Sequence, residues 1–336
     1  MGWFFVMVNF GIIGAGGKMG KAFSANVPSS FNLLAVCDTD PERLTSFPPS
    51  IARYDSCEAM LKRHTLDLVA VATHNRSHFK NTVLALESGS SVLVEKPVSS
   101  DLEEALQLKQ IKLRHGQRIA VDYEVRFSKG ARTAKRFIER YGLMPLETEM
   151  IWVKKRDNKP HDGVIIQDLT HALDLTAHYL FRADNVYCKD ATIGIRAGKE
   201  VFADTSLYLS RWHKVHAIAS YISEHYERSL KIKCKDRVGK IYFIELKFDI
   251  SVDGTSSTDS ICIYDSEGNS YLGQQSPTGH SPIIVKTKKL ERQLCAVGDW
   301  IATGRQTPEI CTLDQAVRNL QICYAAKGYR SQPKPL

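Results

Sequence analysis

The first 122 residues contain five short apolar runs, each followed by a segment with the spacing of an amphipathic helix. Strands are expected at Val8–Ile13, Leu33–Cys37, Leu68–Ala72, Ser91–Val94 and Ile119–Asp122. Helices are expected at Lys18–Asn26, Pro41–Thr45, Ser56–His64, His78–Ser88 and Leu102–Arg114. Continuous apolar strands that alternate with helices are typical of a parallel sheet covered on both faces. Because crossovers between parallel strands are right-handed, the pattern predicts a doubly wound α/β domain over residues 1–123.

Beyond Tyr123 the pattern changes to successive strands. A basic helix at Ser128–Arg140 comes first, and the residues Asp265–Asn269 have the composition of a hairpin turn. Strand-like segments rich in β-branched and aromatic residues lie at Glu147–Lys154, Tyr187–Ile195, Val215–Ile222, Leu230–Cys234, Lys240–Ile250 and Ser260–Asp265. Strands without intervening helices favour an open, mostly antiparallel sheet, so residues 124–336 are expected to form an α+β domain.

Two helices are expected to close the chain, at Lys288–Thr303 and Thr312–Ser331. Thr312 and Gln315 have the spacing of a capping box, in which each side chain bonds the other residue's backbone N–H.

The composition restricts the class of protein. Of 336 residues, 43% are hydrophobic and 24% are charged, which is the balance of a globular chain. The net charge is +8, but the basic residues form no long run, so no nucleic-acid partner is expected. The apolar stretch before Lys18 is broken by Asn9 and Gly11 and is too short to cross a membrane. Eight cysteines without a C-x-x-C pair predict free thiols, no metal site and a cytoplasmic location.

A glycine-rich segment follows the first expected strand and opens a helix. Glycines at such a turn let the backbone approach a pyrophosphate, which the helix N-terminus attracts. Gly14 and Gly16 begin a G-x-G-x-x-G pattern whose third position is Met19, while Gly14, Gly17 and Gly20 form G-x-x-G-x-x-G. A tight turn that serves only packing is the alternative. In its strand–helix setting the loop predicts a Rossmann dinucleotide site with contacts from Gly14, Gly16, Gly17, Lys18 and Met19.

Asp38 is expected to select the cofactor. It ends the second strand, 24 residues after Gly14, where a carboxylate accepts hydrogen bonds from both ribose hydroxyls. Such a carboxylate repels a 2′-phosphate, so NAD is favoured, while nearby Arg43 leaves NADP open.

Several segments resemble the glucose–fructose oxidoreductase and inositol dehydrogenase family. They are Asp67–His78, Ala85–Gly89 and the strand that ends in Glu95-Lys96-Pro97, with Arg237–Ile241, Asp299-Trp-Ile and Leu313-Asp-Gln-Ala further on. The resemblance covers nearly the whole chain and implies a nicotinamide cofactor. It also implies a Lys96–Pro97 bond that is often cis. The second domain's open sheet commonly serves oligomerisation in this family, which implies a homodimer or homotetramer.

Polar residues at two strand ends are expected to contact the cofactor. In open α/β sheets, ligands bind beyond the carboxyl ends of the strands. The expected contacts are Thr73, His74, Asn75, His78, Glu95 and Lys96.

The segment Asp162–Asp174 resembles the family's glycine-led catalytic helix. Hydride transfer from an alcohol needs a base for the hydroxyl proton, and His, or a Lys whose pKa is lowered, suits this role. The resemblance implies that His171 and Lys96 are the acid/base residues. Many members carry an Asp four residues before the His, where this chain has Gln167. Asp168, three residues before it, is expected to orient His171 or contact substrate.

Further substrate contacts are expected from Tyr123, Arg126 and Trp152. Arg126 is either a clamp for an anionic group or a solvated arginine between the domains. The basic run at Lys154–Arg156 either lines a cleft for an anionic substrate or is a solvated edge. Asp174 is expected to be a structural partner or a contact between the domains.

Together these observations predict an oxidoreductase. It would transfer a hydride between NAD(H) and a secondary alcohol or ketone of a sugar, cyclitol or nucleotide sugar. The alternatives are a non-catalytic NAD-binding regulatory protein and an NAD-assisted lyase or hydrolase on the same fold.

Overall fold

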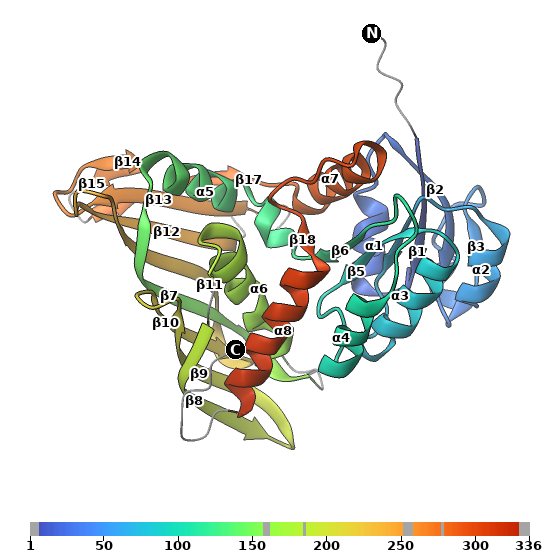
Figure 1. Ribbon diagram of the computed structural model, residues 1–336, viewed down its shortest axis with the longest axis horizontal. Coiled ribbons are helices and arrows are strands. Elements are labelled where there is room, and N and C mark those ends of the chain that lie inside the picture. The colour runs from blue at the N-terminus through green and yellow to red at the C-terminus, as the bar shows by residue number, and fades with distance from the viewer. Residues whose placement is uncertain (1–6, 157–161, 184–185, 251–257, 277–278, 329–336) are drawn as a thin grey trace, which may run out of the picture. The chain divides into compact units, whose positions relative to one another are not determined.

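The computed structural model describes residues 7–156, 162–183, 186–250, 258–276 and 279–328, and the chain divides into two compact units. The first unit comprises the residues up to Glu124 together with Lys289–Val317 (Figure 1). The second comprises Val125–Lys288 and the residues from Arg318 onward. The boundary after Glu124 adjoins the expected one, but Lys289–Val317, expected in the second domain, belongs to the first unit.

The first unit is built on a seven-stranded sheet in the order β18-β6-β5-β4-β1-β2-β3. The strands are β1 Val8–Ile13, β2 Phe31–Cys37, β3 Ala52–Tyr54, β4 Leu68–Val71, β5 Ser91–Glu95, β6 Ile119–Asp122 and β18 Cys311–Thr312. All neighbours pair in parallel except β18, which is antiparallel to β6. The doubly wound parallel sheet is thereby confirmed, and β3 and β18 are additions too short to have an apolar pattern of their own.

Helices of the first unit begin and end at residues with clear local causes. They are α1 Lys18–Ala25, α2 Cys57–Arg63, α3 His78–Glu87, α4 Leu102–Gln110 and α7 Lys289–Thr303, with 3₁₀ turns η1 Pro41–Leu44 and η2 Asn75–Ser77. In α4, for example, the Asp101 side chain accepts the backbone N–H groups of Glu103 and Glu104 at 2.7 and 3.3 Å. The α7 helix packs on this unit because Gly298 leaves room for the ring of Phe31.

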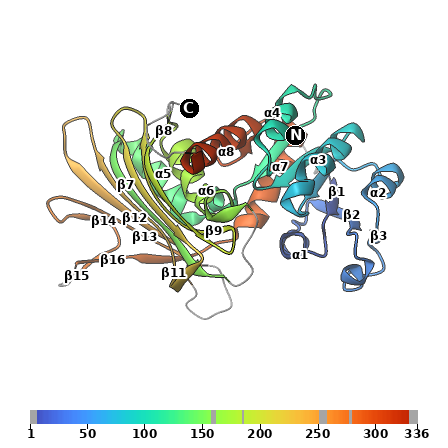
Figure 2. The same ribbon diagram turned by 90° about the horizontal axis from the view of Figure 1, so that it is seen from below.

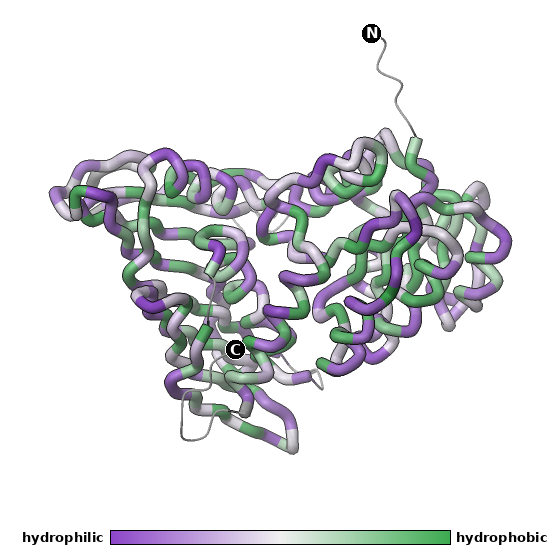
Figure 3. The backbone as a smooth tube through the Cα atoms, viewed as in Figure 1, coloured by the Kyte–Doolittle hydropathy of each residue, from purple (hydrophilic) through white to green (hydrophobic). Residues whose placement is uncertain are grey.

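The second unit is built on an open nine-stranded sheet, mostly antiparallel as expected. Its path is β14-β13-β12-β11-β7-β10-β9-β8, with β17 beside β13, and only β7 and β10 pair in parallel. The strands are β7 Met144–Lys155, β8 Val186–Arg196, β9 Lys199–Leu209, β10 Lys214–Ser220, β11 Ile222–Lys235, β12 Ile241–Ile250, β13 Thr258–Asp265, β14 Ser270–Leu272 and β17 Ile283–Lys286. A small hairpin, β15 Gln274–Ser276 and β16 Gly279–Ser281, stands apart. Hydrophobic and hydrophilic residues alternate along many of these strands (Figure 3).

Helices of this unit lie against one side of the sheet, where Figure 2 shows α5 (Lys129–Tyr141) and α6 (Thr170–Asp174). A 3₁₀ turn, η3 Glu124–Phe127, precedes α5. The expected catalytic helix is not a plain α-helix, because π-helical turns η4 (Ile165–Leu169) and η5 (Leu175–Leu180) flank α6. Among the helices in the described ranges, none combines the length and apolar character needed to cross a bilayer.

The last helix, α8 (Leu313–Gly328), begins with the expected capping box. The Gln315 N–H donates to Thr312 Oγ1 at 3.2 Å, and the Thr312 N–H donates to Gln315 Oε1 at 3.3 Å. The expected end at Ser331 lies outside the described residues.

Candidate active site

The glycine loop between β1 and α1 has a backbone that only glycine fits. Gly14 has a φ of +83°, and a Cβ there would lie 2.6 Å from the carbonyl oxygen of Ala72. A Cβ at Gly20 would lie 2.5 Å from the Cα of Ala15, and Gly17 is the N-cap of α1. These contacts favour the Gly14-Gly17-Gly20 spacing over one that ends at Met19. The bare backbone before a helix N-terminus fits the pyrophosphate of a dinucleotide.

Asp38 stands directly after β2 and is tied to this loop. Its Oδ2 accepts the Gly16 N–H at 2.9 Å and its Oδ1 accepts the Asp40 N–H at 3.1 Å. A carboxylate has about four acceptor sites, so both oxygens keep capacity for ribose hydroxyls. Arg43 pairs with Asp40 at 3.0 Å, and its side chain fills the space that a Cβ at Gly16 would need.

His78 connects two strand-end loops. Its Nδ1 lies 2.7 Å from the carbonyl oxygen of Pro97, and its Nε2 lies 3.0 Å from that of Thr73. The side chain is buried, and burial lowers its pKa. Through both ring nitrogens His78 connects the loops after β4 and β5, and its expected contact with the cofactor stays a prediction. His74 and Asn75, by contrast, open an exposed to half-buried 3₁₀ turn after β4.

A charged cluster stands at the carboxyl ends of β5 and β6. Glu95 ends β5 and is the register partner of Asp122, which ends β6 and is completely buried. Lys96, also buried, follows Glu95, and its bond to Pro97 is cis, as the resemblance implied. Burial raises the pKa of Glu95 to about 7, and burial with the Glu95 charge raises the pKa of Asp122 well above its ordinary value.

Asp122 was missed in the sequence. Its position in the sequence could have indicated it. Like Glu95, Asp122 is an acidic residue at the end of a continuous apolar strand, and ligands bind beyond the carboxyl ends of such strands.

A second polar cluster lies in the second unit, around the π-helical turn η4. The Lys154 ammonium on β7 donates to Asp168 Oδ1 at 2.7 Å, and the Arg156 guanidinium lies 3.9 Å from Asp168 Oδ2. Burial lowers the pKa of Lys154 to about 8, although Asp168 acts in the opposite direction. Lys154 is therefore a partly buried residue paired with Asp168, and not the solvated edge residue of the alternative expectation. Gln167, the preceding residue, is half-buried.

His171 is held by an aromatic neighbour. Its ring stacks on Trp152 of β7 with centroids 6.3 Å apart and planes 20° apart. Trp152 is buried, and the Arg228 guanidinium lies 5.7 Å from the centre of its ring. The substrate contact expected of Trp152 stays a prediction, and the structure adds its ring contact with His171.

Arg126 was expected to clamp an anionic substrate or to lie in solvent, and neither holds. Its Nε and one terminal nitrogen donate to the two oxygens of Asp174 at 2.7 and 2.6 Å, and both side chains are fully buried. The pair ties η3 to α6, so Asp174 is a structural partner as expected. Tyr123 is buried, and Lys155 is an exposed residue that bonds Glu224 at 3.0 Å.

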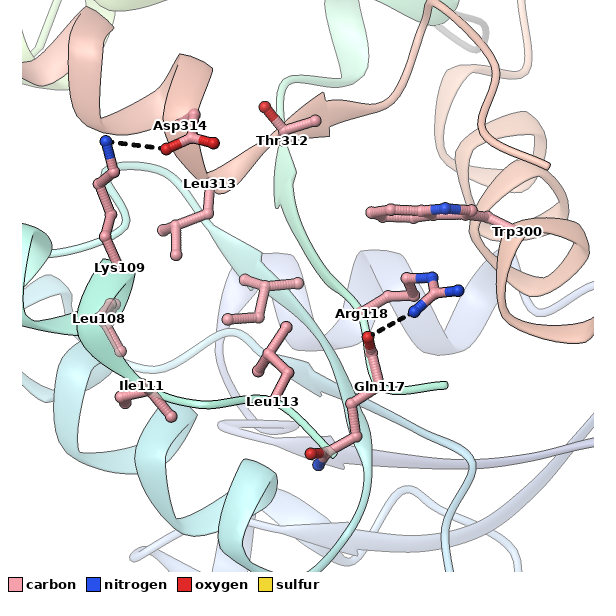
Figure 4. Close-up of a pocket in the computed structure, with 11 residues that line it drawn as sticks. Leu108, Lys109, Ile111, Leu113, Gln117, Arg118, Trp300, Thr312, Leu313 and Asp314 are labelled. Atoms are coloured by element: carbon pink, nitrogen blue, oxygen red, sulfur yellow. Dashed lines mark hydrogen bonds and ion pairs between the residues drawn. The ribbon is translucent and has the colours of Figure 1, made fainter. Parts of the chain in front are cut away.

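A cavity of about 460 Å³ opens elsewhere in the first unit, beside strand β6 and the edge strand β18 (Figure 4). Leu108, Ile111, Leu113 and Leu313 give it apolar walls. Arg118 lies beneath the Trp300 ring, and Lys109 bonds Asp314 at 2.8 Å. None of the residues expected to bind cofactor or substrate lines this cavity.

The fold and the glycine loop are typical of a dinucleotide-binding domain, and the comparisons point to the same class of domain. Residues 8–123 match the model of the oxidoreductase family with an NAD-binding Rossmann fold. This match agrees with the resemblance seen in the glycine loop and in Glu95-Lys96-Pro97.

Two curated relatives illustrate the range of chemistry in related proteins. A 1-carboxy-3-chloro-3,4-dihydroxycyclohexa-1,5-diene dehydrogenase of Comamonas testosteroni is 26% identical over 61% of this chain and 51% of its own length. A D-glucoside 3-dehydrogenase of Escherichia coli is 31% identical over 35% of each chain. The matches thus span 51% and 35% of the length of these relatives.

The fold extends through both units. The solved structure of UDP-N-acetylglucosamine 3-dehydrogenase from Acidithiobacillus ferrooxidans superimposes with a TM-score of 0.73 at 20% identity. The match covers 96% of this chain and 98% of that one. At this identity the likeness shows a shared fold.

Proposed function

We propose that the protein is an NAD(H)-dependent oxidoreductase acting on a secondary alcohol or ketone of a sugar, cyclitol or nucleotide sugar. The observation that carries this proposal is the combination, in one chain, of three features. They are a glycine loop that fits a pyrophosphate, a buried Lys96 at a strand end, and a buried His171 whose ring stacks on Trp152.

The glycine loop and Asp38 would hold the dinucleotide. Gly14, Gly16 and Gly17 with the first turn of α1, at Lys18 and Met19, would contact the pyrophosphate, and Asp38 the adenosine ribose. Thr73, His74 and Asn75 follow β4 and would complete the site. NAD is the proposed cofactor, with NADP open because Arg43 lies against Gly16.

Acid/base chemistry falls to His171 and Lys96. When bound, the nicotinamide would supply hydride transfer between the alcohol and the ketone. His171 would take the hydroxyl proton, and Lys96 would stabilise the developing charge on the oxygen. Asp168, held by Lys154, and Gln167 would bind other substrate hydroxyls. The relatives named above act on ring hydroxyls, which supports a polyhydroxylated ring as substrate.

A homo-oligomeric assembly and a cytoplasmic location are also proposed. Among the described elements, no helix covers the second face of the nine-stranded sheet, which suits a homodimer or homotetramer. All eight cysteines are free, which suits the cytoplasm.

The test is a panel of cyclitols, sugars and nucleotide sugars assayed for NADH absorbance. With a true substrate, Lys96→Ala and His171→Ala should each lower kcat at least ~100-fold while NAD affinity changes little. Absence of NAD binding would refute the proposal. Product formed without net NADH would indicate a lyase or hydrolase, and NAD binding without turnover on any substrate would indicate a regulatory protein.

A further inference from the structure

The charged cluster behind Lys96 holds more negative than positive groups. Glu95 and Asp122 are register partners on adjacent parallel strands, so their side chains leave the sheet on the same face. Glu124 follows two residues later and acts electrostatically on both. The opposing cations are Lys96, which is buried, and Lys18 at the exposed start of α1.

The α7 helix places a neutral side chain beside Asp122. Gln293 on α7 is buried and in polar contact with Asp122. An amide supplies no charge, so it does not neutralise the carboxyl pair. Two adjacent carboxyl groups in such a place cannot both ionise at low cost, and they titrate as one coupled pair.

We propose that Glu95 and Asp122 share one proton and that this pair makes cofactor binding sensitive to the redox state of the nicotinamide. The inference rests on the proposed function for the position of the ring near Lys96. A cationic oxidised ring favours the doubly ionised pair, so its binding releases the shared proton to solvent. A neutral reduced ring leaves the proton in place. Asp122 and Glu95 are thus positioning residues that act through Lys96 and the cofactor.

The direction of the coupling follows from charge alone. Before binding, the two carboxyls carry one negative charge between them, balanced by Lys96. When a positive ring arrives, loss of one proton restores the balance, and linkage requires that NAD⁺ binding tighten as pH rises. NADH binding should depend little on pH over the same range. The relevant range lies around pH 7, where the pKa of Glu95 lies.

The experiment is calorimetric titration of the full chain with NAD⁺ and with NADH at pH 7, in PIPES and in imidazole. The difference in apparent enthalpy between buffers counts the protons exchanged. The wild type should release roughly half a proton on binding NAD⁺ and almost none on binding NADH. Asp122→Asn should abolish the release. Gln293→Glu, which adds a third carboxyl beside Asp122, should increase it. Glu103→Gln on exposed α4 makes the same change in charge as Asp122→Asn and should leave the release unchanged.

A failure of cofactor binding and a failure of the shared-proton proposal give different results. If neither cofactor binds, the proposed function fails, and the shared proton is then tested without cofactor. Because the folded-state pKa of Glu95 is raised, the folded protein binds more protons than the unfolded chain between about pH 4.5 and 7. Stability should therefore fall as pH rises through this range, and less so in Asp122→Asn. Binding of NAD⁺ with less than about a tenth of a proton released, or an equal pH dependence of Tm in wild type and Asp122→Asn, would overturn the inference.

Discussion

In the first unit the candidate residues stand at the ends of buried parallel strands, whereas in the second they are carried by one irregular helix and one long strand. Asp38, Glu95 and Asp122 are placed by backbone register. Asp168 and His171 are placed by side-chain contacts with Lys154 and Trp152. We therefore expect the first site to be sensitive to backbone changes, and the second to the loss of individual side-chain partners.

The largest expected effect concerns the second unit. Arg126→Ala leaves the Asp174 carboxylate buried without its bidentate partner, and should lower the free energy of unfolding by about 3–5 kcal/mol. The measurement is urea unfolding followed by circular dichroism.

A double variant serves as the control for this loss. Arg126→Met with Asp174→Leu removes both charges and should cost far less than the single change. If the double variant is as unstable as Arg126→Ala, the loss reflects packing rather than the buried charge.

The next effect concerns the backbone of the first unit. Gly14→Ala places a Cβ 2.6 Å from the Ala72 carbonyl oxygen at a φ of +83°, and should weaken NAD binding about 100-fold, which corresponds to ~2.7 kcal/mol. The chain offers a matched control in Gly116→Ala, because Gly116 has a φ of +88° but no atom within 4 Å of the added Cβ. Equal losses of NAD affinity in the two variants would mean that the loop at Gly14 does not hold the cofactor.

The difference between residues placed by the backbone and residues placed by side-chain contacts also explains what could be predicted from the sequence. The strands of the first sheet, the glycine loop and the residues after each strand follow from apolar periodicity and from glycine, which act locally on the backbone. The pairing of Arg126 with Asp174 and the stacking of Trp152 on His171 could not be predicted, because a side chain's partner far along the chain leaves no local pattern. The π-helical turns were missed for a related reason, since they depend on packing of the folded unit rather than on the residue spacing of the segment.

A smaller effect tests the side-chain support of His171 and Asp168. Lys154→Met removes the ammonium that donates to Asp168, and should lower kcat/KM about 10-fold, or ~1.4 kcal/mol. Because the pKa of Lys154 is about 8, activity of the wild type should fall as pH rises through 8, when the ammonium loses its charge. A pH–rate profile of both proteins checks this. Lys154→Met should lack that fall, and a profile identical to the wild type's would exclude Lys154 from the site.

The smallest effect lies where α8 begins, and there a local sequence signal alone should determine the outcome. Thr312→Ala removes the hydroxyl that accepts the Gln315 N–H and should lower the free energy of unfolding by about 1 kcal/mol. Thr312→Ser keeps the hydroxyl and should lose at most half of that, as measured by urea unfolding. Unlike Arg126, whose partner is 48 residues away, Thr312 acts on a residue three positions on. An equal loss in Thr312→Ser would show that the methyl packing of Thr312, and not the capping box read from the sequence, stabilises this end of the helix.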